Sequence, residues 1–308
     1  MKRGWALLTI LVVLALVAVP VAAGCGGGET TTTAAPSPET TAAPSPETTG
    51  VSSPETTAGA DAAAAADAAI AAVTKSANIE TPPTIEAGKL MAGSDTSFAP
   101  FEFSDEKGGY TGFDVDLVTA LAKKMGLELE VVPTAWDGII PNLVANRYDI
   151  IMSAMTITED RKKQINFTDG YIPTNLAITT KADAPIADAQ GLVGKIVGVQ
   201  VDTTGQFEVE KIQGVKEIKK YDTIVAAIQD LLAGRVDAVV NDSPVNAYYI
   251  KDKPEFANTG KIGSDDFYGF GIKKENTKLL EAMNAALAEL KAEGTYDKIY
   301  AKWFGTAQ

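Results

Sequence analysis

The feature that most constrains the fold is a change of composition near residue 84. Residues 26–83 contain three copies of Ser-Pro-Glu-Thr-Thr, set in a background of Thr, Ala and Pro. Such a segment offers too little apolar surface to offset the entropy of ordering it, and its prolines favour an extended chain. We therefore expect a spacer here. Its Ala-rich part, residues 61–73, can form a transient helix, but we assign it no packed role because it lacks a convincing apolar stripe. Core formation is left to residues 84–308, enough for one large domain or two smaller ones.

The first 25 residues have the organisation of an export signal. A basic start precedes an apolar run over residues 5–19, and small residues at 22–24 stand directly before Cys25. This order is typical of a lipoprotein signal, so we expect residues 1–24 to be removed and Cys25 to carry a diacylglyceryl group. The lipid would anchor residues 25–83, the spacer, to the membrane. Ala22 stands where Leu or Val is more usual, and the alternatives are a permanent transmembrane helix and an incidental thiol. Either reading holds the remaining chain outside the cytoplasm.

Charge and residue content exclude several classes of function. The formal net charge is −13, which argues against a nucleic-acid partner because phosphate binding needs clustered Lys and Arg. The chain has no histidine, so a Ser-His-Asp triad and a His-containing zinc site are excluded. Cys25 is the single cysteine, so no intramolecular disulfide or cysteine metal cluster can form. We expect no metal, no cofactor and no enzymatic activity.

Apolar segments with strand and helix periods alternate twice along residues 84–308. This order predicts the α/β class, with mostly parallel sheets and helices on their faces. Short polar clusters follow four of the expected strands, at residues 94–95, 153–156, 200–204 and 241–242. Ligands of open α/β sheets bind beyond the carboxyl ends of the strands, so these clusters are the candidate site.

Seven short motifs occur in order along the same part of the chain. They are SDTSFAPFEF at 94–103, GFDVDL at 112–117, WDGIIP at 136–141, TITEDR at 156–161, FTDGY at 167–171, NDSP at 241–244 and GTYDKIYAKWFG at 294–305. With these motifs, residues 90–305 resemble the polar amino-acid-binding proteins of ABC importers, which form extracellular solute-binding protein family 3. The group includes glutamine-, histidine- and lysine/arginine/ornithine-binding proteins.

The resemblance implies a two-lobed periplasmic-binding-protein type II fold. Two mostly parallel sheets would be joined by two crossover strands, near residues 171–175 and 267–270. One lobe would combine residues 84–172 with 269–308, and the other would hold residues 173–268. The lobes would close on a ligand like a hinged trap.

A free amino acid brings one carboxylate and one ammonium group, and a closed cleft must neutralise both. Arg161 is the candidate partner of the carboxylate, because its guanidinium offers two parallel N–H donors. Asp242 is the candidate partner of the ammonium group. The plainer alternatives are a solvated arginine beside two lysines and an Asp that caps a helix or turn.

The resemblance also implies roles for the other candidate residues. Further hydrogen bonds to the ligand would come from the side chains or backbone of Ser153, Ala154, Thr156, Thr203 and Thr204. Phe98 and Trp136 would enclose its aliphatic stem, although both can be ordinary core aromatics. Asp95 would face the end of its side chain, which suits an amide or a cation. Gln200 stands where glutamine-binding members carry Lys, so glutamine is not favoured above basic ligands.

The resulting hypothesis is a lipid-anchored receptor, expected to be a monomer, that delivers a polar or basic L-amino acid to an ABC permease. Its partners would be that amino acid, the permease and, through Cys25, the membrane. Two alternatives stay open on the same fold. One is a periplasmic dehydratase of arogenate or prephenate, and the other is a ligand sensor that acts on a separate membrane protein.

Overall fold

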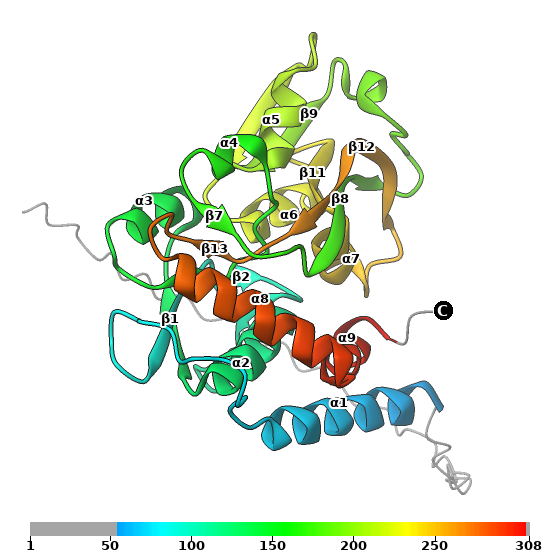
Figure 1. The fold of residues 1–308 in the computed structure, drawn as a ribbon. Helices are drawn as coiled ribbons and strands as arrows, with labels where there is room; N and C mark the ends of the chain where they lie inside the picture. The colour runs from blue at the N-terminus through cyan, green and yellow to red at the C-terminus, as the bar shows by residue number, and fades with distance from the viewer. Residues whose placement is uncertain (1–53, 306–308) are drawn as a thin grey trace, which may run out of the picture. The chain divides into compact units, whose positions relative to one another are not determined.

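The computed structural model describes residues 54–305, and two five-stranded sheets organise this part of the chain (Figure 1). The expected signal segment, Cys25 and the spacer as far as residue 53 lie outside the described residues.

The first sheet has the strand order β5-β1-β6-β13-β7. Its strands are β1 (Lys89–Ser94), β5 (Glu128–Pro133), β6 (Ile150–Ile151), β7 (Asn166–Phe167) and β13 (Gly271–Ile272). β1 pairs in parallel with β5 and β6, whereas β13 pairs antiparallel with β6 and β7. The helices of this part are α2 (Phe113–Met125), α3 (Ile139–Val144), α4 (Glu159–Lys162), α8 (Thr277–Ala292) and α9 (Thr295–Phe304), with the 3-10 turn η1 (Trp136–Gly138).

Helix α2 shows why these segments fold as the apolar periodicity predicts. Leu117, Leu121 and Met125 recur every four residues and are fully buried, while Lys123 and Lys124 lie in the last turn. Gly126 ends the helix at φ 74°, a left-handed conformation that glycine adopts without strain. A small sheet formed by β2 (Ser97–Phe98), β3 (Glu102–Ser104) and β4 (Tyr110–Thr111) precedes this helix.

The second sheet has the strand order β10-β9-β11-β8-β12. Its strands are β8 (Ile172–Lys181), β9 (Ile196–Gln200), β10 (Glu217–Tyr221), β11 (Ala238–Asp242) and β12 (Phe256–Tyr268). β9 pairs in parallel with β10 and β11, and β8 pairs antiparallel with β11 and β12. The helices of this part are α5 (Thr204–Glu210), α6 (Ile224–Leu232) and α7 (Ser243–Ile250), with the 3-10 turn η2 (Ala189–Leu192).

Two short segments connect the sheets. The chain passes from β7 to β8 over residues 168–171 and returns from β12 to β13 over residues 269–270. β8 and β12 pair along their length, beginning with Ile172 opposite Tyr268 at this junction. The predicted α/β class, with two mostly parallel sheets and two crossovers, is confirmed. The lobe boundaries 84–172 with 269–308, and 173–268, remain a prediction.

The Ala-rich segment differs from the sequence-based expectation. Residues 54–72 form helix α1 (Pro54–Ala72), which packs along α9 (Figure 1). Ala66 and Ile70 are buried, and Lys302 of α9 reaches Asp67 at 2.7 Å. The prediction of no packed role was wrong because alanine favours helix and its small side chain permits close approach. An Ala-rich face lacks the strong apolar stripe by which packed helices are usually recognised.

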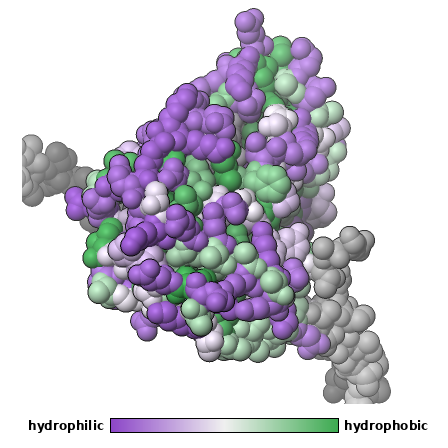
Figure 2. Space-filling view, viewed as in Figure 1, coloured by the Kyte–Doolittle hydropathy of each residue, from purple (hydrophilic) through white to green (hydrophobic). Residues whose placement is uncertain are grey.

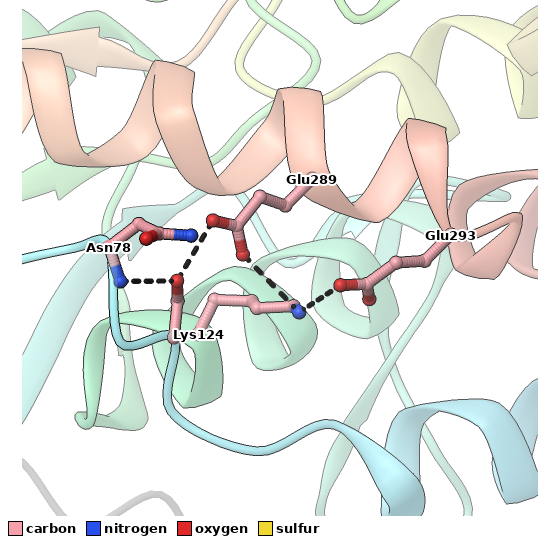
Figure 3. A network of polar contacts seen from close by, with 5 residues as sticks. Asn78, Lys124, Glu289 and Glu293 are labelled. Carbon is pink, nitrogen blue, oxygen red and sulfur yellow. Dashed lines mark hydrogen bonds and ion pairs between the residues drawn. The ribbon is translucent and has the colours of Figure 1, made fainter.

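A polar network fixes the segment that follows α1 to the first part of the fold (Figure 3). Ser76 Oγ donates to Glu289 Oε1 at 2.8 Å and accepts a bond from the Asn78 N–H at 3.1 Å. Lys124 Nζ, whose side chain is buried, bridges Glu289 and Glu293 of the α8 region. The expected spacer over residues 25–83 is therefore too long, because parts of residues 59–83 contact α2, α8 and α9.

Replacing Ala66 with aspartate is expected to lower the free energy of unfolding by about 1–3 kcal/mol, because a carboxylate would be forced into an apolar contact. Urea unfolding measures the change. Ala65→Asp, at an exposed position of the same helix, is the matched control and should change the stability by less than about 0.5 kcal/mol. Equal effects of the two substitutions would show that α1 does not pack in solution.

The face in Figure 2 is mostly hydrophilic, with hydrophobic residues in small separate patches. Such scattered patches are normal on a protein surface. Among residues 54–305, no helix is long and apolar enough to cross a membrane.

Candidate functional site

Ten of the eleven residues proposed from the sequence line one small cavity, which is built from both parts of the fold. They are Phe98, Trp136, Ser153, Ala154, Thr156, Arg161, Gln200, Thr203, Thr204 and Asp242. The eleventh, Asp95, lies behind this lining and accepts a hydrogen bond from Gln200 Nε2 at 2.8 Å. The cavity has a volume of about 10 Å³, which is room for about one water molecule. The two parts are therefore closed against each other.

Hydrogen bonds across the cleft hold this closed arrangement. Trp136 Nε1 and Arg161 Nη2 both donate to the carbonyl oxygen of Asp202, at 3.1 and 3.4 Å. Tyr249 OH donates to the carbonyl oxygen of Ser97 at 2.7 Å. Tyr249 was given no role from the sequence, and Asp202 lies inside the predicted cluster 200–204 but was given no role of its own. Asp202 has φ 56°, a left-handed conformation that Asp tolerates better than most residues. An Asp just after the predicted strand was therefore the sequence signal for a turn that exposes its carbonyl.

Arg161 is a buried cation at the edge of the cavity. It lies in α4, whose start is fixed by Thr158 Oγ1, which accepts the backbone N–H of Arg161 at 3.2 Å and caps the helix. Nη1 donates to the Thr156 carbonyl at 2.9 Å, and the guanidinium carbon lies 5.0 Å from the centre of the Trp136 ring. Burial excludes the alternative of a solvated charge, since Arg161 is 8 % exposed.

The guanidinium of Arg161 forms no ion pair within residues 54–305. Burial lowers the pKa of Arg161 to about 10, although the negative charges of Asp242 and Asp202 oppose the shift. The side chain therefore remains protonated at neutral pH. A buried, charged guanidinium with only carbonyl partners is a strong attractor for a carboxylate.

Asp242 is the corresponding buried acid. It ends β11 and is 7 % exposed, and its Oδ1 accepts a hydrogen bond from Thr174 Oγ1 of β8 at 3.0 Å. Burial raises the pKa of Asp242 to about 6, while the neighbouring hydroxyls of Tyr268 and Thr174 and the charge of Arg161 act in the opposite direction. Asp242 stands at the N-cap position of α7, but its side chain accepts no hydrogen bond from a backbone N–H of the helix. The alternative that Asp242 serves to cap this helix is therefore wrong.

The remaining lining residues come from strand ends, as the sequence indicated. Ser153, Ala154 and Thr156 follow β6, and Thr203 and Thr204 follow β9. Gly205 lets the start of α5 approach β11, because a Cβ there would lie 2.8 Å from the Val240 carbonyl oxygen. The hydroxyl of Thr203 is already used, since it donates to the Gln200 carbonyl and accepts the Gln206 N–H.

Asp95 and Gln200 form a paired polar end of the site. Gln200 Nε2 donates to Asp95 Oδ2, and Ser97 Oγ donates to Asp95 Oδ1 at 2.7 Å. Burial raises the pKa of Asp95, and these two hydrogen bonds oppose the shift. The end of the site therefore presents an acid and an amide, with no cation among the groups that contact them.

Two buried acids directly behind the cavity were not identified from the sequence. Glu102 accepts a hydrogen bond from Ser153 Oγ, and Asp114 accepts one from the Ala154 N–H. Both lie inside motifs quoted above, FEF and GFDVDL, and an acid between apolar residues was the available signal. Within the part of the chain that the structure describes, no group of three or more His, Cys, Asp or Glu side chains is arranged to hold a metal ion.

Comparison with known proteins agrees with this geometry. Residues 90–306 match the family of bacterial extracellular solute-binding proteins, family 3. The chain belongs to this family. The family 3 relative L-cystine-binding protein TcyJ of Escherichia coli is 34 % identical over 224 residues, which cover 71 % of this chain and 84 % of TcyJ.

Solved structures extend the family comparison to the fold. An ancestral arginine-binding protein bound to arginine is 43 % identical, with a TM-score of 0.68 over 71 % of this chain and 99 % of its own. The ancestral amino-acid-binding protein AncCDT-1, a precursor of cyclohexadienyl dehydratase, is 41 % identical, with a TM-score of 0.66 over 70 % of this chain and 96 % of its own. These neighbours have the type II periplasmic-binding-protein fold, so the predicted fold is confirmed.

Proposed function

We propose that this family 3 protein captures one polar or basic L-amino acid between its two lobes and delivers it to an ABC permease. The observation that carries the proposal is the pair Arg161 and Asp242. Both are buried and both line the same cavity. Neither forms an ion pair with another described residue, so each lacks a neutralising charge that a zwitterion would supply.

In the proposed complex, the carboxylate of the ligand lies against the guanidinium of Arg161 and its ammonium group against Asp242. The ligand side chain runs past Phe98 and Trp136 toward Asp95 and Gln200. An acid and an amide at that end favour a cationic or amide side chain over an acidic one. Ancestral relatives bound to arginine and to glutamine support a cationic or amide side chain.

The ligand must enter an opened form, because the closed cavity holds about one water molecule. The two short connections between the sheets are the natural hinges for opening. Closure around the ligand would present the permease with a surface that the open form lacks.

A thermal-shift screen of the twenty amino acids with ornithine, citrulline and cystine tests the proposal. A ligand that binds only the folded state stabilises it by about 2.7 kcal/mol at a hundred times its Kd. We expect a rise in Tm with at least one of Arg, Lys, His and Gln, and no rise with glutamate. Absence of a shift with every compound would refute amino-acid binding.

AncCDT-1 makes a dehydratase the second candidate, because it is an amino-acid-binding precursor of cyclohexadienyl dehydratase. Incubation with arogenate and prephenate separates the two candidates. We expect neither phenylalanine nor phenylpyruvate to form, since Arg161 and Asp242 suit capture of an intact amino acid. Formation of either product would show that the protein is a dehydratase and would overturn the proposal of simple amino-acid capture.

We also propose that the chain is lipid-anchored through Cys25. Cys25→Ser is expected to abolish incorporation of a labelled fatty acid and to release the protein from the membrane fraction, because the thiol is the acceptor of the lipid. Gel fluorescence after metabolic labelling measures the change, with Ser53→Ala in the adjoining segment as the control. Labelling that persists in Cys25→Ser would contradict the anchor.

A further inference from the structure

Ser153 and Ala154 form the part of the cavity lining that we call its floor. Glu102 of β3 and Asp114 of α2 are both fully buried directly behind this floor. Glu102 Oε1 accepts a hydrogen bond from Ser153 Oγ at 3.1 Å. Asp114 Oδ2 accepts two, from the Ala154 N–H at 3.1 Å and from Tyr171 OH at 2.7 Å. The two acids therefore hold consecutive residues of the cavity lining.

Each acid has one oxygen that these contacts leave unused. Glu102 Oε2 and Asp114 Oδ1 have no hydrogen-bond partner among the described residues, which is unusual for buried polar atoms. The two carboxyl groups interact with each other, and two adjacent buried carboxylates cannot both ionise. One proton retained by the pair would remove one charge and would let one carboxyl group donate an O–H to the other.

The surroundings of the pair favour a retained proton. Burial raises the pKa of Glu102 well above its usual range and the pKa of Asp114 to about 7. Tyr171 donates to Asp114, and the other ionisable groups that interact electrostatically with the pair are also acids or phenols, namely Asp95, Tyr249, Tyr268 and Tyr296. Among the described residues, none of these neighbours supplies a positive charge that would keep both acids ionised.

The segment that the pair holds is strained. Ala154 has φ 41°, a left-handed conformation that a residue with a Cβ adopts only when its surroundings require it. Asp114 supplies that requirement by accepting the Ala154 N–H. Ser153 Oγ also accepts the N–H of Asp95 at 3.0 Å, so the same arrangement fixes both the floor and the polar end of the site.

The pair is connected to a hinge as well. Tyr171, which donates to Asp114, stands immediately before crossover strand β8. Its N–H donates to the Tyr268 carbonyl at 3.0 Å, and its carbonyl oxygen accepts from Tyr296 OH at 2.6 Å. The contacts of Asp114 therefore link the cavity floor to the point where the chain crosses between sheets.

We propose that Glu102 and Asp114 share one proton and act together as positioning residues, which hold the strained Ser153–Ala154 backbone and Asp95 in the geometry that binds the ligand. The inference rests on the proposed function for its effect on binding. The shared proton itself does not depend on the identity of the ligand.

Amide substitutions test the shared proton. In Glu102→Gln or Asp114→Asn, one amide N–H replaces the proton, so each variant should bind L-arginine or L-glutamine within about threefold of the parent. In the double variant, two NH₂ groups face each other, and binding should fall by about tenfold or more, well beyond the product of the single effects. Asp114→Ala should lower the affinity by about tenfold, because the Ala154 N–H is left without its acceptor. Asp114→Asn keeps an acceptor oxygen and should therefore retain the affinity of the parent.

Calorimetry measures the Kd, and urea unfolding is followed in parallel. A purely structural role would change the stability of the double variant and leave its Kd unchanged, which would overturn the positioning role. Infrared spectroscopy of the parent without ligand should show a protonated carboxyl carbonyl band at pH 7 that disappears in Glu102→Gln. Absence of this band, or single variants as impaired as the double, would overturn the shared proton. If the parent binds no amino acid, the proposed function fails. The infrared band, and the urea unfolding of the parent with the single and double variants, still show whether Glu102 and Asp114 share a proton.

Discussion

Replacing Arg161 with alanine is expected to weaken binding of the L-amino acid ligand by at least about thirtyfold. Loss of one partner of a buried, hydrogen-bonded charge pair costs about 2–5 kcal/mol, which corresponds to a factor of roughly thirty to several thousand. The carboxylate of the ligand would otherwise be buried without a cation, because Arg161 is the charged group at this side of the cavity lining. Isothermal titration calorimetry with the best ligand of the screen measures the change.

The stability of the ligand-free protein should respond differently. Arg161 is buried with no ion pair in the described chain, so its removal relieves a desolvation cost as well as losing two carbonyl hydrogen bonds. We expect the free energy of unfolding to change by less than about 1 kcal/mol. Lys162→Ala is the control, since Lys162 is adjacent in α4 but exposed and paired with Glu159. An equal loss in the control, or unchanged affinity in Arg161→Ala, would contradict the carboxylate role.

Replacing Asp242 with asparagine is expected to weaken ligand binding by about thirtyfold or more. Asparagine keeps the shape of the side chain and an oxygen that can accept the Thr174 hydroxyl, so the change mainly removes the negative charge. The ammonium group of the ligand would then be buried against a neutral amide. Calorimetry at pH 7.5 measures the loss, with Asp252→Asn, at an exposed position outside the site, as the matched control.

The same substitution should remove a pH dependence of the affinity. The pKa of Asp242 is raised to about 6 in the ligand-free protein, and only the ionised carboxylate neutralises an ammonium group. Affinity should therefore be full above pH 6 and should fall by up to about tenfold per pH unit below it, because binding must then release a proton. Asp242→Asn should show no such fall between pH 7.5 and 5. An affinity of the parent that is constant over this range would contradict the assignment.

The residues that the sequence proposed for the site lie together in one cavity because they follow strands. Strand ends can be read from apolar periodicity, and the carboxyl ends of parallel strands meet at one edge of a sheet. Ser153, Gln200 and Asp242 were placed in this way, and all three line the cavity. The motifs around them indicated the family, which the match over residues 90–306 confirms.

The sequence was less informative about packing on the outside of the fold. Helix α1 lacks large apolar residues, so its contact with α9 was not expected from periodicity. The anchor at Ser76 depends on Glu289, which is 213 residues further along the chain. Pairings over such distances leave no local pattern that could have been read.

By itself, therefore, the sequence determined the α/β class, the family, and which strand ends carry polar residues, since these follow from local periodicity and from motifs. Only the tertiary structure decided the charge state of the site. Whether Arg161 and Asp242 are buried without ion pairs, and whether Glu102 and Asp114 are buried beside each other, depends on which distant side chains reach them. Asp95 meets Gln200 across 105 residues, for instance. Burial and pairing set the cost of a charge, and both are properties of the folded arrangement alone.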